Sequence, residues 1–182
     1  MIHLVLGGAR SGKSQFAENL ASSLSNKQSE NHLSVCYIAT ATAGDIEMER
    51  RIAHHKKTRP SNWDLVEEPL HLSSVIADRE QKHEVVLIDC LTLWLSNWLC
   101  SNKQSEWLEE KERFVSQLQK SEKQIILVSN EVGSGIVPMG ELSRDFVDHA
   151  GWLNQVIAKI ADKASLIVAG CEVPLKTGRS EV

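Results

Sequence analysis

The sequence predicts an α/β protein with a mainly parallel central sheet and helices on both faces of that sheet. Short apolar runs, typical of buried strands, alternate along the chain with longer segments of helical periodicity. Helical crossovers between successive strands make those strands parallel. The chain has 182 residues, of which 42% are hydrophobic and 24% charged. We therefore expect one domain over residues 1–182 with a sizeable core.

The first apolar run, Ile2 to Leu6, leads directly into a phosphate-binding pattern. The sequence GGARSGKS at 7–14 fits G-x-x-x-x-G-K-[ST], and Phe16, Leu20 and Leu24 then follow with helical spacing. In such a loop backbone N–H groups surround phosphate oxygens, the lysine reaches the β- and γ-phosphates, and the final hydroxyl ligates Mg²⁺. An ordinary tight turn is the structural alternative. The predicted nucleotide-binding residues are Gly7, Gly8, Ala9, Arg10, Ser11, Gly12, Lys13 and Ser14.

Polar segments follow the other predicted strands at the ends that point toward this loop. A small-residue loop, 40–44, follows the strand at 34–39, and Asp89 follows the strand at 84–88. The carboxylate of Asp89 is expected to hold Mg²⁺ directly or through water. A Gly-rich segment, 130–138, follows the strand at 124–129. Carboxyl ends of parallel strands share one sheet edge, so these segments predict a nucleoside triphosphate site there.

The remaining elements complete an alternating pattern. A short strand is expected at 63–66 and the last strand at 166–169, while the tail from about residue 174 is expected to be loose. Trp94 and Trp98 lie in a very apolar segment and are assigned to core packing or a subunit interface. Helices are predicted at 15–25, 45–57, 69–77, 91–99, 106–122 and 140–161, the last with Gly151 as a candidate break.

Composition excludes several classes of function. The net charge of -4 gives no basic surplus for nucleic acid, and no apolar run approaches the length that spans a bilayer. The amino terminus enters a strand with no signal-peptide pattern, so a cytoplasmic location is expected. No two of the four cysteines form a C-x-x-C pair. Cys36, Cys90 and Cys171 lie in or beside apolar runs and are expected to be buried and reduced.

Two adjacent histidines stand in the predicted helix at 45–57. Met48, Ile52 and His55 share one helical stripe, and His54 projects about 100° away from it. A histidine on an apolar stripe is more often a packed side chain than a nucleophile. A neutral imidazole, with an ordinary pKa near ~6.5, can nevertheless attack a phosphate and pass the bound group onward. The residues alone leave both roles open for both histidines.

Four segments together resemble a known enzyme family. They are GGARSGKS at 7–14, YIAT at 37–40, RIAHHKKTRP at 51–60 and SNEVGSGIVP at 129–138. In order and spacing they are similar to the bifunctional adenosylcobinamide kinase / adenosylcobinamide-phosphate guanylyltransferase family, over nearly the whole chain. The resemblance implies a recombinase-like, three-layer phosphate-loop fold and a homotrimer.

The resemblance also implies two reactions. ATP or GTP phosphorylates adenosylcobinamide, and GTP then donates GMP to adenosylcobinamide phosphate, which gives adenosylcobinamide-GDP and pyrophosphate. His55 would carry GMP covalently, Lys13 would serve the transferred phosphates, and Ser14 and Asp89 would bind Mg²⁺. Beyond the phosphate loop, the residues implied in nucleotide binding are Thr40, Ala41, Thr42, Lys56, Lys57, Thr58, Arg59, Glu67 and Asp89.

Two other classes of function compete with this interpretation. A simple phosphate-loop small-molecule kinase explains residues 7–14 and Asp89 but gives the histidine segment no role. A recombinase-type nucleotide switch or assembly ATPase would need a basic or partner-binding surface, and the sequence shows neither. Asn130 and Glu131 are left without an assigned role, because turn chemistry before Gly133 explains them equally well.

Overall fold

The computed structural model describes residues 1–26, 35–42, 60–135 and 138–178. Within these ranges the chain forms a seven-stranded sheet with the strand order β3-β2-β4-β5-β1-β6-β7. Neighbouring strands are parallel except for the antiparallel pair β6–β7, which confirms the mainly parallel sheet. The strands are β1 (Ile2–Gly7), β2 (Val35–Ala39), β3 (Asp64–Glu67), β4 (Val85–Asp89), β5 (Gln124–Asn130), β6 (Lys163–Val168) and β7 (Cys171–Thr177).

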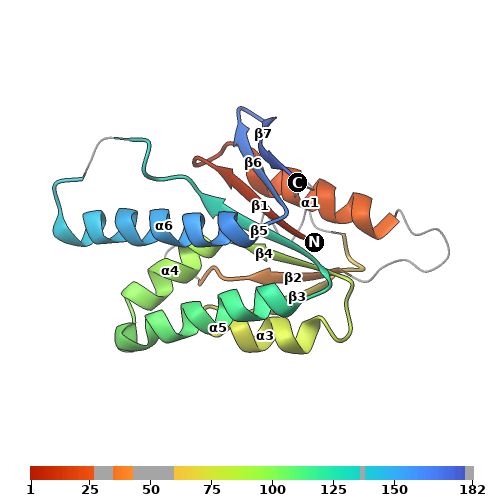
Figure 1. Ribbon diagram of the computed structural model, residues 1–182, viewed down its shortest axis with the longest axis horizontal. Helices are drawn as coiled ribbons and strands as arrows, with labels where there is room; N and C mark the ends of the chain where they lie inside the picture. The colour runs from red at the N-terminus through yellow and green to blue at the C-terminus, as the bar shows by residue number, and fades with distance from the viewer. Residues whose placement is uncertain (27–34, 43–59, 136–137, 179–182) are drawn as a thin grey trace.

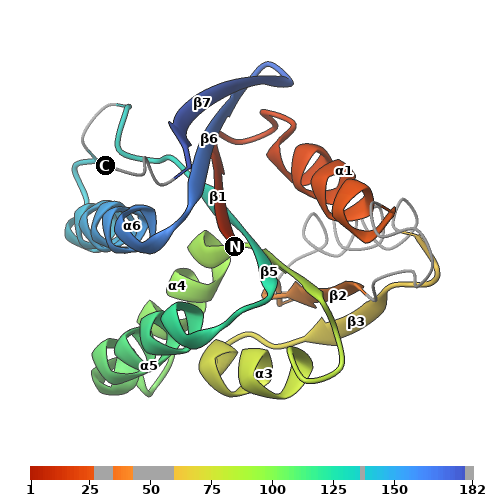
Figure 2. The same ribbon diagram turned by 45° about the vertical axis from the view of Figure 1, so that its right-hand side comes forward.

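Helices lie on both faces of the sheet and make a three-layer arrangement (Figure 1). Figure 2 shows α1 alone on one face, among the described helices, and α3 to α6 on the other. No helix in the described ranges is long and apolar enough to cross a membrane. The helices are α1 (Lys13–Asn26), α3 (Leu72–Arg79), α4 (Leu91–Leu99), the short 3-10 helix η1 (Gln104–Glu106), α5 (Trp107–Lys120) and α6 (Glu141–Ile160).

Two hydrophobic cores hold these layers together. Ala17 and Ala21 of α1 pack with Val5, Leu87 and Val128 on one face of the sheet. The larger core lies on the opposite face and contains the apolar side chains of α3 to α6. Trp94 and Trp98 are fully buried in this second core, and both indole N–H groups donate to the carbonyl of Leu70, at 2.7 and 2.9 Å. Core packing, as predicted for these two tryptophans, is therefore confirmed.

The expectation of a loose tail from residue 174 is wrong for residues 174–177, which belong to β7, and residues 179–182 lie outside the described part of the chain. β7 pairs antiparallel with β6, and the Lys176 Nζ donates to the carbonyl of Ala158, at 3.2 Å, in the last turn of α6. A cation at this end of a helix also compensates the helix dipole. Pro174 is tolerated because β7 is an edge strand and the pairing carries an irregularity beside Ser165. The hairpin, rather than a free tail, completes this side of the sheet.

Other expectations need smaller corrections. α6 runs without interruption through Gly151, and the last parallel strand begins at Lys163, three residues earlier than predicted. Cys36 and Cys90 are buried as expected, but Cys171 is exposed, because it starts an edge strand. The predicted helix at 91–99 coincides with α4. The helix predicted at 45–57 lies outside the described residues.

Candidate nucleotide-binding site

Four predicted polar segments meet at the carboxyl edge of the parallel strands. β5 lies between β1 and β4 in the sheet, and β2 lies on the far side of β4. Gly7 is in register with Asn130, and Asp89 is in register with Val128 on one side and Ala39 on the other. The phosphate loop, Asp89, Asn130 and the segment after β2 therefore lie along one edge, as the sequence predicted.

The phosphate loop is connected to the elements on both of its sides. Within it, the Ser11 N–H donates to the Gly8 carbonyl at 3.3 Å. On the β5 side the Glu131 N–H donates to the Gly7 carbonyl at 3.1 Å. On the other side the Gly170 N–H, in the β6–β7 turn, donates to the Ser11 carbonyl at 2.8 Å. These bonds fix the shape of the loop before any phosphate arrives.

Two glycines of the loop leave little space for a side chain. Gly12 has a φ of +93°, and a Cβ built on it would lie 3.2 Å from the Gly170 Cα. A Cβ on Gly7 would lie 2.8 Å from the Ile167 carbonyl oxygen. Close packing against β6 and the hairpin turn, as well as backbone conformation, therefore demands glycine here.

Lys13 begins α1, so the positive end of that helix points at the loop. Its Nζ donates to the Gly8 carbonyl at 3.1 Å, which places the ammonium group over the loop itself. The Ser14 side chain follows in the first turn and is partly exposed. Loop amides, helix dipole and ammonium group together provide positive potential for a chain of phosphates.

Asp89 ends β4 with its carboxylate held by one neighbour. The Tyr37 hydroxyl donates to Oδ2 at 3.1 Å. Among the described residues no cluster of three or more His, Cys, Asp or Glu side chains suits a metal ion. Mg²⁺ in nucleotide sites takes one or two protein oxygens, with phosphates and waters completing its octahedron. Asp89 and Ser14 fit that donor set, because each offers a side-chain oxygen at the phosphate edge.

Cys90, beside Asp89, is excluded as a nucleophile. Burial first, and then the Asp89 carboxylate, raise the pKa of the Cys90 thiol to about 11. A thiol in that state is not ionised near neutral pH and reacts poorly. The peptide bond that joins the two residues is cis.

In the segment after β2, the Thr40 side chain is bonded inside the protein. Thr40 is fully buried, and its hydroxyl donates to the Cys90 carbonyl at 2.7 Å and accepts from the Cys90 N–H at 2.8 Å. The hydroxyl thus ties β2 to β4. Thr42 is exposed, so its side chain and the backbone of Ala41 are better placed to meet a ligand.

Glu67 lies at the same level of the sheet but far from the phosphate loop. It is in register with Ala39, and β3 is separated from β1 by three strands. Four strand spacings of roughly 4.8 Å put β3 roughly 19 Å from β1. Glu67 and the loop therefore cannot contact the same phosphate group.

The end of β5 carries two polar residues without a predicted role. The Glu131 carboxylate accepts the Gly133 N–H at 2.8 Å, which is the turn chemistry expected from the sequence. The backbone of Asn130 is held on both sides, since its N–H donates to the Thr92 hydroxyl at 2.7 Å and its carbonyl accepts the Asn154 amide at 3.1 Å. Asn130 thus has a fixed backbone directly beside the phosphate loop.

Some predicted site residues lie outside the described part of the chain. These are His54, His55, Lys56, Lys57, Thr58 and Arg59. Sequence reasoning, in turn, missed the β6–β7 turn that supports the phosphate loop. The sequence signal for this turn was the dipeptide Ala169-Gly170. In the structure both residues have positive φ, at 51° and 79°. A glycine at the second position is typical of a tight hairpin turn.

A phosphate loop on β1, a carboxylate on β4 and a mainly parallel sheet define a phosphate-loop nucleotide-binding protein. The chain has a similar fold to a KaiC-like protein from Pyrococcus horikoshii, with a TM-score of 0.51 and 12% identity, over 91% of this chain and 69% of the other. This likeness concerns the fold alone.

Sequence comparison identifies the family. Residues 3–175 match the family model described as cobinamide kinase / cobinamide phosphate guanyltransferase, and the chain belongs to that family. It is 48% identical to a bifunctional adenosylcobalamin biosynthesis protein of Pseudomonas aeruginosa, covering 97% of this chain and 98% of the relative. A protein of the same description from Escherichia coli is 39% identical, covering 97% of this chain and all of the relative (100%). The resemblance found from the motifs is thereby confirmed.

Proposed function

We propose that this chain carries out both reactions of its family at one nucleotide site. In the first, ATP or GTP transfers its γ-phosphoryl group to the hydroxyl of adenosylcobinamide. In the second, GTP transfers GMP to adenosylcobinamide phosphate, which gives adenosylcobinamide-GDP and releases pyrophosphate. The observation that carries the proposal is the family match over residues 3–175, because that range contains both the phosphate loop and the histidine segment.

Both reactions use a nucleoside triphosphate, but a different group attacks it in each reaction. The kinase step forms a bond between the acceptor hydroxyl and the γ-phosphorus of ATP or GTP. For the second step we propose that the His55 imidazole attacks the α-phosphorus of GTP, so that pyrophosphate leaves and GMP becomes bound to His55. An oxygen of adenosylcobinamide phosphate then displaces the imidazole. Splitting the transfer in this way replaces one difficult step by two easier ones.

The remaining predicted residues take supporting roles in this proposal. The loop amides and Lys13 would hold the β- and γ-phosphates, and Lys56 and Arg59 would offset charge on the transferred group. Ser14 and Asp89 would hold Mg²⁺, which neutralises charge on the phosphates when bound. Thr40 would act through its backbone, and Ala41, Thr42, Lys57, Thr58 and Glu67 would contact other parts of the nucleotide.

Covalent labelling tests the proposal directly. Wild type is incubated with GTP that is radioactive at the α-phosphate, without acceptor, and compared with His55→Ala, His54→Ala and Lys13→Ala. We expect an acid-labile label on wild type and on His54→Ala, and none on His55→Ala. Release of that label by adenosylcobinamide phosphate would complete the evidence for transfer. A simple kinase would take no label from the α-position, and that result would overturn the guanylyltransferase half.

We further propose that one domain carries both activities, that it works in the cytoplasm where nucleoside triphosphates are available, and that it assembles as a homotrimer.

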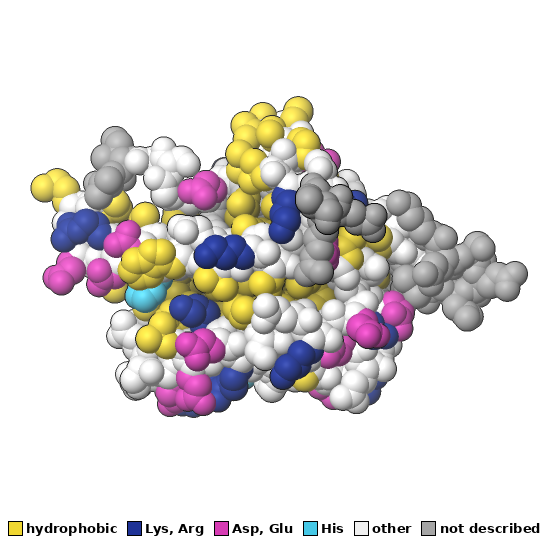
Figure 3. Space-filling view, viewed as in Figure 1, with side chains coloured by type: hydrophobic (Ala, Val, Ile, Leu, Met, Phe, Trp, Pro, Cys, Tyr) yellow, Lys and Arg dark blue, Asp and Glu magenta, His cyan; other side chains and the backbone are white. Residues whose placement is uncertain are grey.

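The β6–β7 hairpin exposes apolar side chains, seen as the yellow projection at the top of Figure 3. Val168, Val173 and Leu175 there are 52%, 45% and 56% exposed. Contiguous apolar surface of this kind suits contact between copies. Sedimentation equilibrium should give three chains per particle, and a monomer at micromolar concentration would contradict the trimer.

A further inference from the structure

Asn130 has a side-chain atom whose hydrogen-bonding state the fold does not explain. Its Oδ1 is closed off from solvent and has no hydrogen-bond partner in the described structure. Buried polar atoms are usually paired, and an unpaired one at a site often marks where a ligand binds. Ser11 Oγ, in the phosphate loop on the neighbouring strand, is in the same state. Two unpaired buried oxygens therefore lie at the edge where phosphates are expected.

The side chain of Asn130 lies on the phosphate-loop face of the sheet. Side chains alternate between faces along a strand. Val128 packs in the core under α1, so Asn130, two residues later on β5, is on the same face. Leu87 is in that core as well, which places Asp89 on this face too. Asp89 and Asn130 thus accompany α1 and its phosphate loop.

Strand order then places Asn130 between the two parts of the phosphate site. The loop follows β1, Asp89 ends β4, and β5 is the strand between them. A triphosphate that starts in the loop and reaches toward Asp89 must pass over the end of β5. Asn130 is in register with Gly7, where the loop begins, so it lies at the end of β5 directly beside the phosphate loop.

The chemistry of an amide oxygen narrows the missing partner. This oxygen can only accept a hydrogen bond, so its partner must be a donor. Ionised phosphate oxygens are acceptors and do not qualify. The nearby Lys13 ammonium is over the loop on the Gly8 carbonyl. Two kinds of hydroxyl at this edge are donors: that of Ser11, which is itself unpaired, and that of an acceptor about to attack the outer phosphate.

We propose that Asn130 Oδ1 accepts a hydrogen bond from the acceptor's hydroxyl and aligns it with the γ-phosphorus in the kinase step. This inference rests on the proposed function. The hydroxyl oxygen forms the new bond to phosphorus, the bond to the β–γ bridging oxygen breaks, and nucleoside diphosphate leaves. As the new bond forms, the hydroxyl proton leaves its hydrogen bond to Oδ1 and passes to a phosphoryl oxygen, because an amide oxygen is too weak a base to take it. Asn130 contributes alignment, which is worth about 10²-fold when a reacting atom is misplaced by about 1 Å.

The same contact does not help guanylyl transfer. The attacking atoms there are an unprotonated ring nitrogen of His55 and then an ionised phosphate oxygen, and neither atom carries a proton to donate to an amide oxygen. The Asn130 side chain should therefore assist the kinase step, in which a hydroxyl attacks, and have no effect on guanylyl transfer. Its backbone is already fixed by Thr92 and Asn154, so removal of the side chain leaves those hydrogen bonds in place.

The test measures both half-reactions on the full-length chain. Asn130→Ala and Asn130→Gln are compared with wild type and with the control Asn19→Ala, an exposed asparagine on α1. Transfer of label from γ-labelled GTP to adenosylcobinamide reports the kinase step. Covalent label from α-labelled GTP, without acceptor, reports guanylylation. Melting temperature and the Kd of a fluorescent, non-hydrolysable GTP analogue report folding and nucleotide binding.

We expect Asn130→Ala to lower the kinase kcat about 10²-fold, with α-labelling, analogue Kd and melting temperature close to wild type. Asn130→Gln keeps an amide but displaces it, so it should also lose at least about tenfold in kcat. Asn19→Ala should match wild type in every assay. Equal losses in both half-reactions, an unchanged kinase rate, or full activity of Asn130→Gln would each overturn the inference. Failure of wild type to take the α-label would instead overturn the guanylyltransferase proposal, while the kinase comparison would still test Asn130.

Discussion

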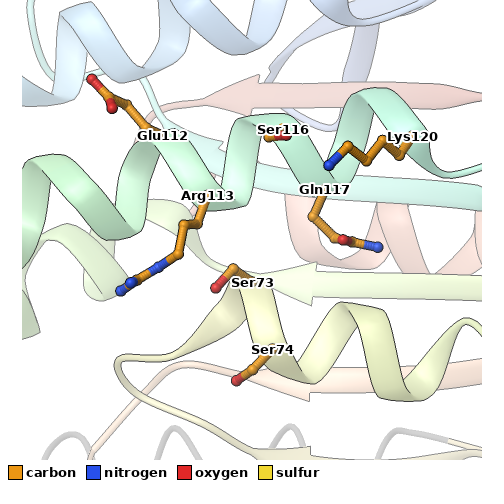
Figure 4. A pocket seen from close by; sticks show the side chains of 7 residues that line it. All are labelled: Ser73, Ser74, Glu112, Arg113, Ser116, Gln117 and Lys120. Carbon is orange, nitrogen blue, oxygen red and sulfur yellow. The ribbon is translucent and has the colours of Figure 1, made fainter.

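Polar side chains gather in two places in this molecule, the groove between α3 and α5 and the carboxyl edge of the sheet. Beside the groove the Glu110 side chain is buried, with 1% exposed, and the Ser73 N–H and hydroxyl donate to its carboxylate at 2.9 and 3.0 Å. Arg113 Nε also donates to it at 3.2 Å. Figure 4 shows this groove, with the side chains of Ser73, Ser74, Glu112, Arg113, Ser116, Gln117 and Lys120 around it.

At the sheet edge the same kinds of groups are left open. The Asp89 carboxylate accepts a hydrogen bond from the Tyr37 hydroxyl, and the buried Oδ1 of Asn130 has no partner among the described residues. A buried carboxylate with all its hydrogen bonds made inside the protein stabilises the fold, because breaking the set leaves an unpaired charge. Polar groups held in place with bonds still to make are suited to a ligand. The Glu110 carboxylate is therefore suited to a structural role, whereas Asp89 and Asn130 are suited to binding a ligand.

The largest expected effect of a substitution is on the reaction rates, for a residue at the sheet edge. Lys13→Ala should lower both γ-phosphoryl transfer and α-labelling by at least about 10³-fold, because the ammonium group offsets charge on the transferred phosphates. Its melting temperature should stay close to that of wild type. Lys120→Ala, in the groove, is the matched control and should leave both rates unchanged. A Lys13→Ala protein that kept guanylylation would show that the two reactions use separate sites.

The reverse result is expected in the groove. Glu110→Ala removes a buried carboxylate and strands the Ser73 and Arg113 donors, so it should cost about 3 kcal/mol in the free energy of unfolding. Chemical denaturation measures this loss, and the kcat of the remaining folded enzyme should not change. Glu112→Ala, an exposed neighbour on α5, should change stability by less than about 0.5 kcal/mol. A specific loss of kcat in Glu110→Ala would mean that the groove serves the reaction.

A third prediction concerns the support of the phosphate loop by the β6–β7 turn. Gly12→Ala places a methyl group against Gly170 at a positive φ, so it should cost about 1–2 kcal/mol and weaken nucleotide binding. Gly151→Ala makes the opposite control. That glycine lies inside α6, and nothing lies within 4 Å of a Cβ built on it. It should gain about 0.5–1 kcal/mol in thermal unfolding without affecting binding.

The smallest effect is a pH dependence of stability. Burial first lowers the pKa of His3 from its ordinary 6.5, and Lys163 lowers it further, while Glu172 opposes both. The folded state therefore favours neutral imidazole, and the unfolded chain binds the proton more readily. This stability is present above pH 6.5 and is lost as the pH falls through that value toward the folded pKa. In urea unfolding, the free energy of unfolding should decrease more between pH 7.5 and pH 5.5 for wild type than for His3→Gln. Equal decreases for the two proteins would contradict this role of His3.

The sequence predicted the elements of the site better than their surroundings. The phosphate loop, Asp89 and α4 could be predicted because local spacing and strand ends determine them. β7 could not, because Pro174 and the mixed pattern of 171–177 conceal a strand that is stabilised by contacts distant in sequence, such as the bond from Lys176 to the end of α6. The exposure of Cys171 follows from the same edge position.

The order of the strands in the sheet also could not be predicted from the sequence. No local pattern shows that β3 lies at the far edge, so the distance between Glu67 and the phosphate loop could not be known from the sequence. Nor could the sequence show that the Thr40 hydroxyl is used by Cys90 while Asn130 keeps an unpaired oxygen. Such differences arise only when the register between strands is fixed.

One measurement tests the central claim, that a single nucleotide site at the carboxyl edge serves both reactions. Equilibrium dialysis with non-hydrolysable GTP and ATP analogues gives the number of sites per chain and shows whether the two compete. We predict one nucleotide site per chain and full competition between the GTP and ATP analogues. Lys13→Ala should bind neither analogue. Two sites per chain, or ATP analogue that stays bound while GTP analogue saturates, would contradict the account.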